Sequence, residues 1–203
     1  MDIEEQSEGA TPLMAAAFWG NFEIVKYLVE QGADIEVGGG DTPLLMAAQE
    51  GHLDVVKYLV EQGADIKAGG GRTPLMEAAM DGELELVEYL VEQGADINAT
   101  DYDNATPLIW AAGPGVSLDV VRYLVEHGAD IEAEDWRGDT PLMAAVRSRS
   151  LDVVGYLLEQ GADASTTNNE GRTALSLASE LYPGSELEAL LMKYEREKEA
   201  IHE

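Results

Sequence analysis

The stretch TPLLMAAQEGHLDVVKYLVEQGADI, residues 42–66, decides the fold, because its parts recur along the whole sequence. Its opening Thr-Pro-Leu occurs at Thr11, Thr42, Thr73, Thr106 and Thr140, and a Thr-Ala-Leu variant begins at Thr173. The intervals are 31 to 34 residues, and Gly-Ala-Asp recurs nearly in phase, at Gly32, Gly63, Gly94, Gly128 and Gly161. A fixed period of this length indicates a stack of small supersecondary units.

Each recurring motif has a structural reason. Threonine is a good N-cap, because its hydroxyl accepts a hydrogen bond from the first helical turn, and proline suits the next position. The Ala47-Ala48 pair follows, and Gly51 ends the first expected helix. The second expected helix, around residues 53–61, has apolar residues at helical spacing. Each unit is therefore predicted to hold two helices and a tight finger, and to bury its apolar stripe only by stacking.

The combined pattern Thr-Pro-Leu-x-x-Ala-Ala…Gly…Val-Val-x-Tyr-Leu-Val-x-x-Gly-Ala-Asp-Ile resembles the ankyrin repeat over nearly the whole chain. The resemblance implies an all-α ankyrin-repeat solenoid of six helix–turn–helix units with short β-hairpin-like fingers, curved with a concave groove. We expect one domain over residues 1–203. Its repeats are expected at 7–37, 38–68, 69–100, 101–134, 135–167 and 168–194, with a charged C-terminal tail at 195–203.

The chain departs from the family pattern after Thr-Pro-Leu, where the family usually places a histidine that ties neighbouring loops together. Five apolar residues and one serine occupy that position: Met14, Leu45, Met76, Ile109, Met143 and Ser176. Apolar side chains cannot make those hydrogen bonds. We therefore expect the fingers to be held more by packing.

The charge balance restricts the partners. The chain has 40 Asp and Glu against 12 Lys and Arg, a net charge of −28. Nucleic acid and anionic lipid are themselves polyanions that bind through Lys and Arg, so we expect no nucleic acid and no membrane partner. Such a field attracts a basic protein or peptide, and it also keeps the chain soluble and monomeric. The chain has no cysteine and no long apolar run, so a cytoplasmic location is expected.

Catalytic and cofactor motifs are absent from the sequence. The three histidines, His52, His127 and His202, are not placed to share a metal or to activate a nucleophile. There is no Gly-x-Ser-x-Gly, no His-Glu-x-x-His, no P-loop and no cysteine nucleophile. We therefore expect no enzyme activity, no metal and no cofactor.

Three weaker ligand or modification sites have simpler explanations. The glycine runs 38–40 and 69–71 could cradle a phosphate, but a capping threonine follows each and no lysine does, so a shortened turn is favoured. Acidic residues in fingers four and five could hold calcium, yet they lack the spacing of a calcium loop. Asn98 lies in a stretch that resembles an asparagine-hydroxylation site, and an asparagine closing a finger hydrogen bond is the favoured interpretation.

The resemblance implies that a partner binds on the concave side, which first helices and finger tips line. Counting from each capping threonine predicts the contact residues Phe18, Trp19, Met46, Glu50, Glu77, Met80, Asp81, Tyr102, Asp103, Trp110, Trp136, Arg137 and Asp139. All three tryptophans belong to this set and none to the repeating core, which is typical of interface hot spots. For Trp110 the alternative is local filling beside the Gly-Pro-Gly loop at 113–115, and for Trp19 it is covering the outer face of repeat one.

The first and last repeats differ in their expected outer faces. The last repeat ends in a charged run, whereas the first reads like an internal repeat, with the apolar residues Phe22, Ile24, Val25, Leu28 and Val29. Its outer face is therefore expected to be apolar and exposed, either as a contact patch or as an imperfect cap that a stable array tolerates. The favoured hypothesis is a protein-binding adaptor, inhibitor or immunity-type protein that is monomeric, with weak self-association possible through repeat one. The alternatives are a structural tether that self-associates through this uncapped repeat, and an engineered ankyrin binding scaffold.

Overall fold

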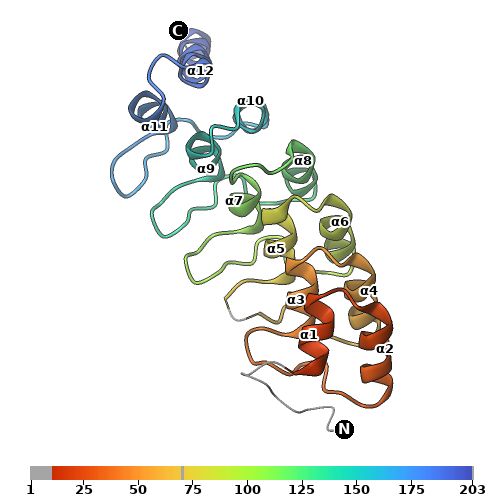
Figure 1. Ribbon diagram of the computed structural model, residues 1–203. Helices are drawn as coiled ribbons and strands as arrows, with labels where there is room; N and C mark the ends of the chain where they lie inside the picture. Colours follow the sequence, from red (N-terminus) through yellow and green to blue (C-terminus); the bar gives the residue numbers. More distant parts are fainter. Residues whose placement is uncertain (1–10, 70, 203) are drawn as a thin grey trace. The chain divides into compact units, whose positions relative to one another are not determined.

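The computed structural model describes residues 11–69 and 71–202 of the chain. These residues fall into two compact units, Met1–Asp101 and Tyr102–Glu203, each with three pairs of helices (Figure 1). The described ranges contain no β-strand. The predicted all-α fold of six helix–turn–helix units is therefore confirmed.

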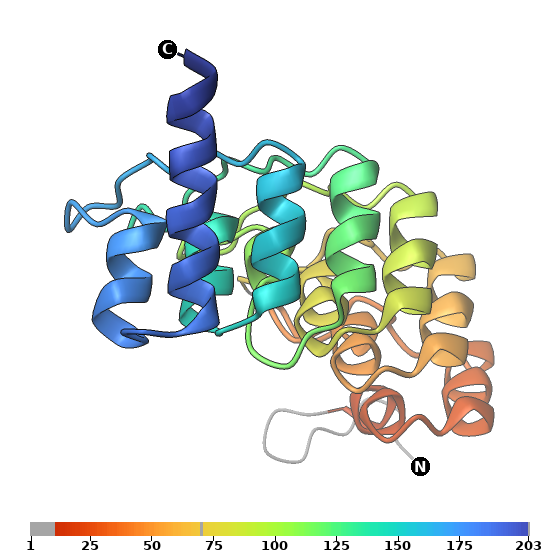
Figure 2. The same cartoon turned by 90° about the horizontal axis from the view of Figure 1, so that it is seen from above.

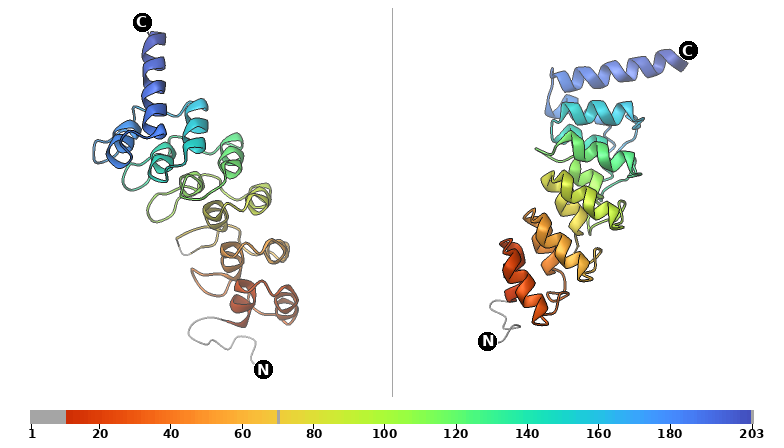
Figure 3. Two further views of the ribbon diagram at one scale, coloured as in Figure 1. Left: turned by 45° about the horizontal axis from the view of Figure 1, so that its top comes forward. Right: turned by 90° about the vertical axis from the view of Figure 1, so that its right-hand side faces the viewer.

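The first unit contains two kinds of helix. Its first helices, α1 (Pro12–Phe18), α3 (Pro43–Gln49) and α5 (Pro74–Asp81), pack on one another in sequence order. Its second helices, α2 (Phe22–Glu30), α4 (Leu53–Glu61) and α6 (Leu84–Glu92), stand in a separate row (Figures 1 and 3). Each second helix packs on the first helix of its own repeat, so every repeat is a helical hairpin.

The second unit repeats this arrangement. Its first helices are α7 (Pro107–Ala111), α9 (Pro141–Arg147) and α11 (Ala174–Leu181), and its second helices are α8 (Leu118–Glu126), α10 (Leu151–Glu159) and α12 (Glu186–His202). Helix α7 has only five residues, because Gly113 and Pro114 follow and cannot extend it. Figure 2 shows α12 continuing well past its neighbour α10.

Every first helix begins at a threonine that caps it. In all six repeats the threonine Oγ1 accepts a hydrogen bond from the amide three residues later, at 3.2 to 3.4 Å. Proline follows the cap in five of the six helices. The predicted N-cap role of this motif is confirmed.

The core of each unit is built from the repeated small and branched residues. Ala17, Ala48, Ala79 and Ala112 have no exposed surface, which lets the first helices of one unit approach closely. The paired valines and leucines of the second helices, such as Val55 and Leu59, are likewise completely buried. Because these side chains are buried in the stack, specificity for a binding partner must come from other positions.

The turns after the second helices share one local structure. The aspartate of each Gly-Ala-Asp accepts a hydrogen bond from the amide two residues later, at 2.9 to 3.0 Å, in all five copies. This side-chain turn fixes the direction in which the chain leaves for the finger. The amide of Asn98 donates one of these bonds, to Asp96.

The two ends of the array differ in how much of their apolar surface is exposed. In repeat one, Ile24 and Tyr27 are exposed, whereas in α12 Leu187 and Leu191 are buried against α10 and α11. Helix α12 runs through His202, so the run expected as a charged tail continues this helix as far as residue 202. Among the described residues, no helix combines the length and apolarity needed to cross a bilayer.

Candidate functional site

The candidate binding surface of each unit consists of its first helices and the fingers that precede them. Figure 1 shows the fingers projecting on the side of the first helices, away from the second helices. In the second unit, the finger tips bring together four predicted contact residues, Tyr102, Asp103, Trp136 and Arg137. We call these four residues, with Asn169 of the last finger, the finger-tip surface.

Hydrogen bonds tie the three fingers of the second unit together. The amide of Trp136 donates to the carbonyl of Asp103 at 2.7 Å, and the amide of Asn169 donates to the carbonyl of Arg137 at 2.8 Å. The Asn169 Nδ2 also donates to the carbonyl of Trp136, at 3.0 Å. The expectation that the fingers are held more by packing is therefore wrong for this unit, because main-chain groups and an asparagine supply bonds where no histidine is present.

The finger-tip surface presents two aromatic rings to solvent. Tyr102 is 86% exposed and Trp136 is 56% exposed. The Arg137 guanidinium carbon lies 4.8 Å from the centroid of the Trp136 ring, a cation–π contact that orients both side chains. Exposed aromatic rings on hydrogen-bonded loops can be buried by a partner at little cost in ordering.

Asp139 was predicted as a contact residue, and the structure buries it to 3% exposure. Its Oδ2 lies 2.6 Å from Arg147 Nε, and its Oδ1 accepts a bond of 2.6 Å from Asn168 Nδ2. Its own amide donates to Asp135 Oδ1. This carboxylate is thus engaged inside the unit and holds finger five against finger six. The Asn168-Asn169 pair was the sequence signal from which this contact between fingers could have been predicted.

The positions of Asp139 and Arg147 form a recurring pair. We use the term rim pair for the residue before a capping threonine and the residue seven positions after that threonine. In the next repeat the rim pair has the opposite polarity, with Arg172 Nη1 2.9 Å from Glu180 Oε2. In repeat three, Arg72 Nη1 contacts Met80 Sδ at 3.4 Å. The two positions of the rim pair thus hold chemically different side chains in different repeats, and these side chains still meet.

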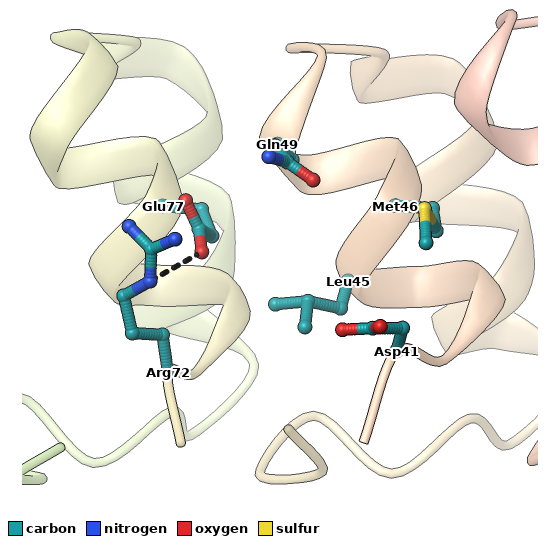
Figure 4. A pocket seen from close by; sticks show the side chains of 6 residues that line it. All are labelled: Asp41, Leu45, Met46, Gln49, Arg72 and Glu77. Carbon is teal, nitrogen blue, oxygen red and sulfur yellow. Dashed lines mark ion pairs between the residues drawn. The ribbon is translucent and has the colours of Figure 1, made fainter. Parts of the chain in front are cut away.

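The first unit has a pocket between α3 and α5. Its volume is about 310 Å³, and it is lined by Asp41, Leu45, Met46, Gln49, Arg72 and Glu77 (Figure 4). Glu77 is only 3% exposed, and its Oε1 lies 3.0 Å from Arg72 Nε. Burial raises the pKa of Glu77 above its ordinary value. The Arg72 guanidinium opposes that rise, and the carboxylates of Asp81 and Asp41 add to it.

The remaining predicted contact residues have varied exposure. Trp19 is 71% exposed and meets Phe18 edge-on, with ring centroids 5.1 Å apart. Glu50 and Asp81 are exposed, while Met46, Met80 and Trp110 are half-buried. Trp110 lies in the short α7, one residue before its end. Whether these side chains contact a partner stays a prediction.

The two histidines with described side chains make local contacts. His52 Nε2 donates to the carbonyl of Phe18 at 2.9 Å, which joins repeats one and two. His127 Nδ1 lies 2.7 Å from the carbonyl of Tyr123 and its ring stacks on that tyrosine. The side chain of His202 lies outside the described residues. Within the described part of the chain, no group of three or more His, Cys, Asp or Glu side chains is arranged to hold a metal ion.

Comparison with protein families matches the chain to Ankyrin repeats (3 copies), over residues 1–69, 36–101, 67–135, 100–168 and 134–200. The chain belongs to the ankyrin repeat family. Ankyrin repeats are protein–protein interaction modules, and the fold is typically a non-catalytic binding scaffold. The ankyrin motif read from the sequence is therefore confirmed.

Among solved structures, the crystal structure of the human ASB11 ankyrin repeat domain is similar to this chain. The two are 30% identical with a TM-score of 0.88, and the match covers 96% of this chain and 87% of that one. None of the curated proteins compared with the chain gave a significant match. Because 625 solved chains match this chain, the likeness identifies the architecture and leaves the partner to be argued from the surface.

Proposed function

We propose that this ankyrin repeat protein is a non-catalytic cytoplasmic adaptor, inhibitor or immunity-type module, monomeric and built as one domain, that binds a basic protein or peptide. The observation that carries the proposal is the finger-tip surface, where Tyr102 and Trp136 are exposed on fingers tied by hydrogen bonds. Their scaffold does not need these rings, because neither is part of the repeated core. Aromatic residues of this kind dominate the binding energy of protein interfaces.

The net charge supports a basic partner. A charge of −28 on 203 residues steers cations toward the chain and accelerates their association, most strongly at low salt. Exposed Asp103 belongs to the finger-tip surface and directly follows Tyr102 in the sequence. A partner that presents Lys or Arg next to an apolar patch would match both features.

The test is capture of partners from native lysate on the immobilised chain, followed by mass spectrometry. Tyr102→Ala combined with Trp136→Ala should abolish capture of a specific basic protein, since truncating such anchors costs about 2 kcal/mol or more. The matched control is Tyr27→Ala, which removes an exposed ring from the second helix α2. Capture that is unchanged in the double variant, or lost equally in the control, would contradict the proposal.

Salt separates specific binding from charge attraction. At about 0.5 M NaCl long-range attraction is largely screened, so capture that depends only on net charge is lost in every variant. A partner held through buried aromatic contacts should persist with the wild-type chain. Loss of all capture with salt alone would point to non-specific attraction.

A second candidate function is self-association through repeat one, which Ile24 and Tyr27 favour because both are exposed on α2. The residues of such a patch would be covered in a dimer. Sedimentation at increasing concentration tests this candidate. A monomer over the whole range would refute it, and a dimer that Ile24→Glu dissociates would support it.

A further inference from the structure

We propose that the pocket between α3 and α5 is a recognition site for one arginine side chain of the partner. This inference rests on the proposed function, and it names the residue type that the partner presents to the first unit. The pocket is formed by two neighbouring repeats, with Leu45 and Gln49 on one side and Arg72 and Glu77 on the other (Figure 4).

Glu77 is the side chain that marks this pocket as a cation site. Counted from the capping threonine, its position holds Ala15, Met46, Trp110, Ala144 or Leu177 in the other repeats, so the stack itself needs no carboxylate there. Glu77 is nevertheless 3% exposed, and burying a charge that the fold does not need is costly. Such a residue indicates a use outside the stack.

The carboxylate of Glu77 has one unused acceptor. Its Oε1 pairs with Arg72 Nε, whereas its Oε2 is buried without a hydrogen-bond partner among the residues that the structure describes. A buried acceptor left without a donor costs free energy, which is regained when a donor arrives. A cationic donor gains most, because Asp41 and Asp81 add further negative charge around Glu77.

The other pocket residues suit an arginine. Asp41 and Gln49 are exposed and offer further acceptor oxygens, while Leu45 and Met46 can cover the aliphatic part of the side chain. A guanidinium carries five N–H donors in one plane and is weakly hydrated, so it can serve several acceptors in a partly buried place. An ammonium is compact and more strongly hydrated, and it suits this pocket less well.

Access to Glu77 requires a small movement of Arg72. The Arg72 side chain is 36% exposed, so rotation toward solvent lets the incoming guanidinium approach the carboxylate. The pocket is 310 Å³ in volume, at the lower end of the range of small-ligand pockets. One side chain fits in such a pocket, and a folded domain does not enter it.

The test is an NMR titration of the full chain with Nα-acetyl-arginine amide, followed at the methyl groups of Leu45 and Met46. The expected result is saturable binding with a Kd of about millimolar, because a single side chain is the whole ligand. The acetyl-lysine amide should bind more weakly, and the neutral acetyl-citrulline amide should give no saturable shift. Tighter binding of lysine, equal binding of citrulline, or no saturation with arginine would each overturn the proposal.

Variants assign the binding to this pocket. Glu77→Gln should weaken the arginine probe by about tenfold, the value of one charge-assisted hydrogen bond. Asp41→Asn, at an exposed position, should weaken it less and keeps the test decisive if the buried variant fails to fold. Glu30→Gln removes the same charge from an exposed position at the end of α2, outside the pocket, and should change nothing. Equal affinity in all of these chains would refute the assignment.

The titration contains no partner protein, so its outcome is separate from that of the capture experiment. If the arginine probe does not bind, only the arginine site is refuted, and the finger-tip surface remains the proposed interface. If the arginine probe binds but no specific partner is captured from lysate, the proposed function of the finger tips is refuted, and the arginine site stands.

Discussion

Arg147 Nε and Asp139 Oδ2 lie 2.6 Å apart, although one residue ends α9 and the other precedes its cap. The same rim pair in the next repeat, Arg172 and Glu180, reverses the two charges and keeps a distance of 2.9 Å. The repeat therefore fixes where the two side chains meet, and the sequence decides their polarity. In repeat five the aspartate is the buried member of the pair, so replacing it should lower the stability of the folded chain.

Asp139→Asn should lower the free energy of unfolding of the chain. The change leaves Arg147 facing a neutral amide and disturbs the bond from Asn168, so we expect a loss of about 1–3 kcal/mol. Urea unfolding followed by circular dichroism measures it. The control is Glu170→Gln, which removes an exposed partner of Arg172 and should cost at most about 1 kcal/mol. Equal losses in the two variants would contradict the buried-pair account.

Gly20→Ala should be more damaging than alanine at other left-handed glycines. Gly20 has a φ of +63°, and a Cβ there would lie 2.5 Å from Nδ1 of the His52 ring. The ring would have to rotate and give up its bond to the Phe18 carbonyl. Backbone strain alone costs about 1–2 kcal/mol at a left-handed residue, and the displaced ring adds to it. Thermal unfolding compares the variants.

Two further chains separate strain from the steric clash. Gly128→Ala also has a positive φ, of +94°, with open space around the added Cβ, so it reports the backbone strain alone. The double variant Gly20→Ala with His52→Ala removes the ring that would clash. If the stability lost in the double variant equals the sum of the losses in the two single variants, the His52 ring is not the cause.

Glu77 should make the chain less stable as pH rises. Burial raises the pKa of Glu77 above its ordinary value of 4.5, so the folded chain binds more protons than the unfolded chain above that value. The stability contributed by the protonated form is present below 4.5 and is lost as pH rises through the folded pKa. Relative to Glu77→Gln, the wild type should therefore lose free energy of unfolding as pH rises above 4.5.

Asp163 provides a control of opposite sign. Hydrogen bonds from the Ser165 side chain and amide lower the pKa of Asp163 below its ordinary value of 3.8. The stability that the ionised Asp163 carboxylate contributes is present above pH 3.8 and is lost as pH falls through the folded pKa. The wild type should thus lose stability relative to Asp163→Asn in acid. If the stability difference between the wild type and the variant changed with pH in the same direction for both residues, general charge repulsion, and not these sites, would set the pH dependence.

Added salt should stabilise the chain. A net charge of −28 repels itself most strongly in the compact folded state, and the Debye length falls from about 30 Å at 0.01 M salt to about 10 Å at 0.1 M. The melting temperature should rise between these two concentrations. Circular dichroism melts in NaCl measure it, and a melting temperature that falls with salt would show that the ion pairs, of which the described residues form six, outweigh the repulsion.

The framework could be predicted from the sequence because its parts act locally. A threonine caps the helix that starts beside it, and the aspartate of Gly-Ala-Asp bonds to an amide two residues away, so short motifs carry the whole geometry. The short α7 follows in the same way from Gly113 and Pro114. These features require no knowledge of distant contacts.

The surface could be predicted only in part, because it depends on side chains from different repeats. Exposure of Tyr102 and Trp136 followed from their place in the repeat, but the burial of Asp139 depends on Asn168, 29 positions later. The bond from Asn169 to the Trp136 carbonyl likewise spans 33 positions. Both bonds join different repeats, so a pattern within one repeat does not predict them.

The bonds between the three fingers of the second unit also have a thermodynamic consequence for binding. A loop that is ordered during folding has little conformational entropy left to lose when a ligand arrives. Gly38 and Gly39, at positive φ in the finger at residues 38–40, have more backbone conformations open to them than residues with a side chain. A partner seated on Tyr102 and Trp136 should thus bind with a smaller entropic penalty than one that must immobilise those glycines.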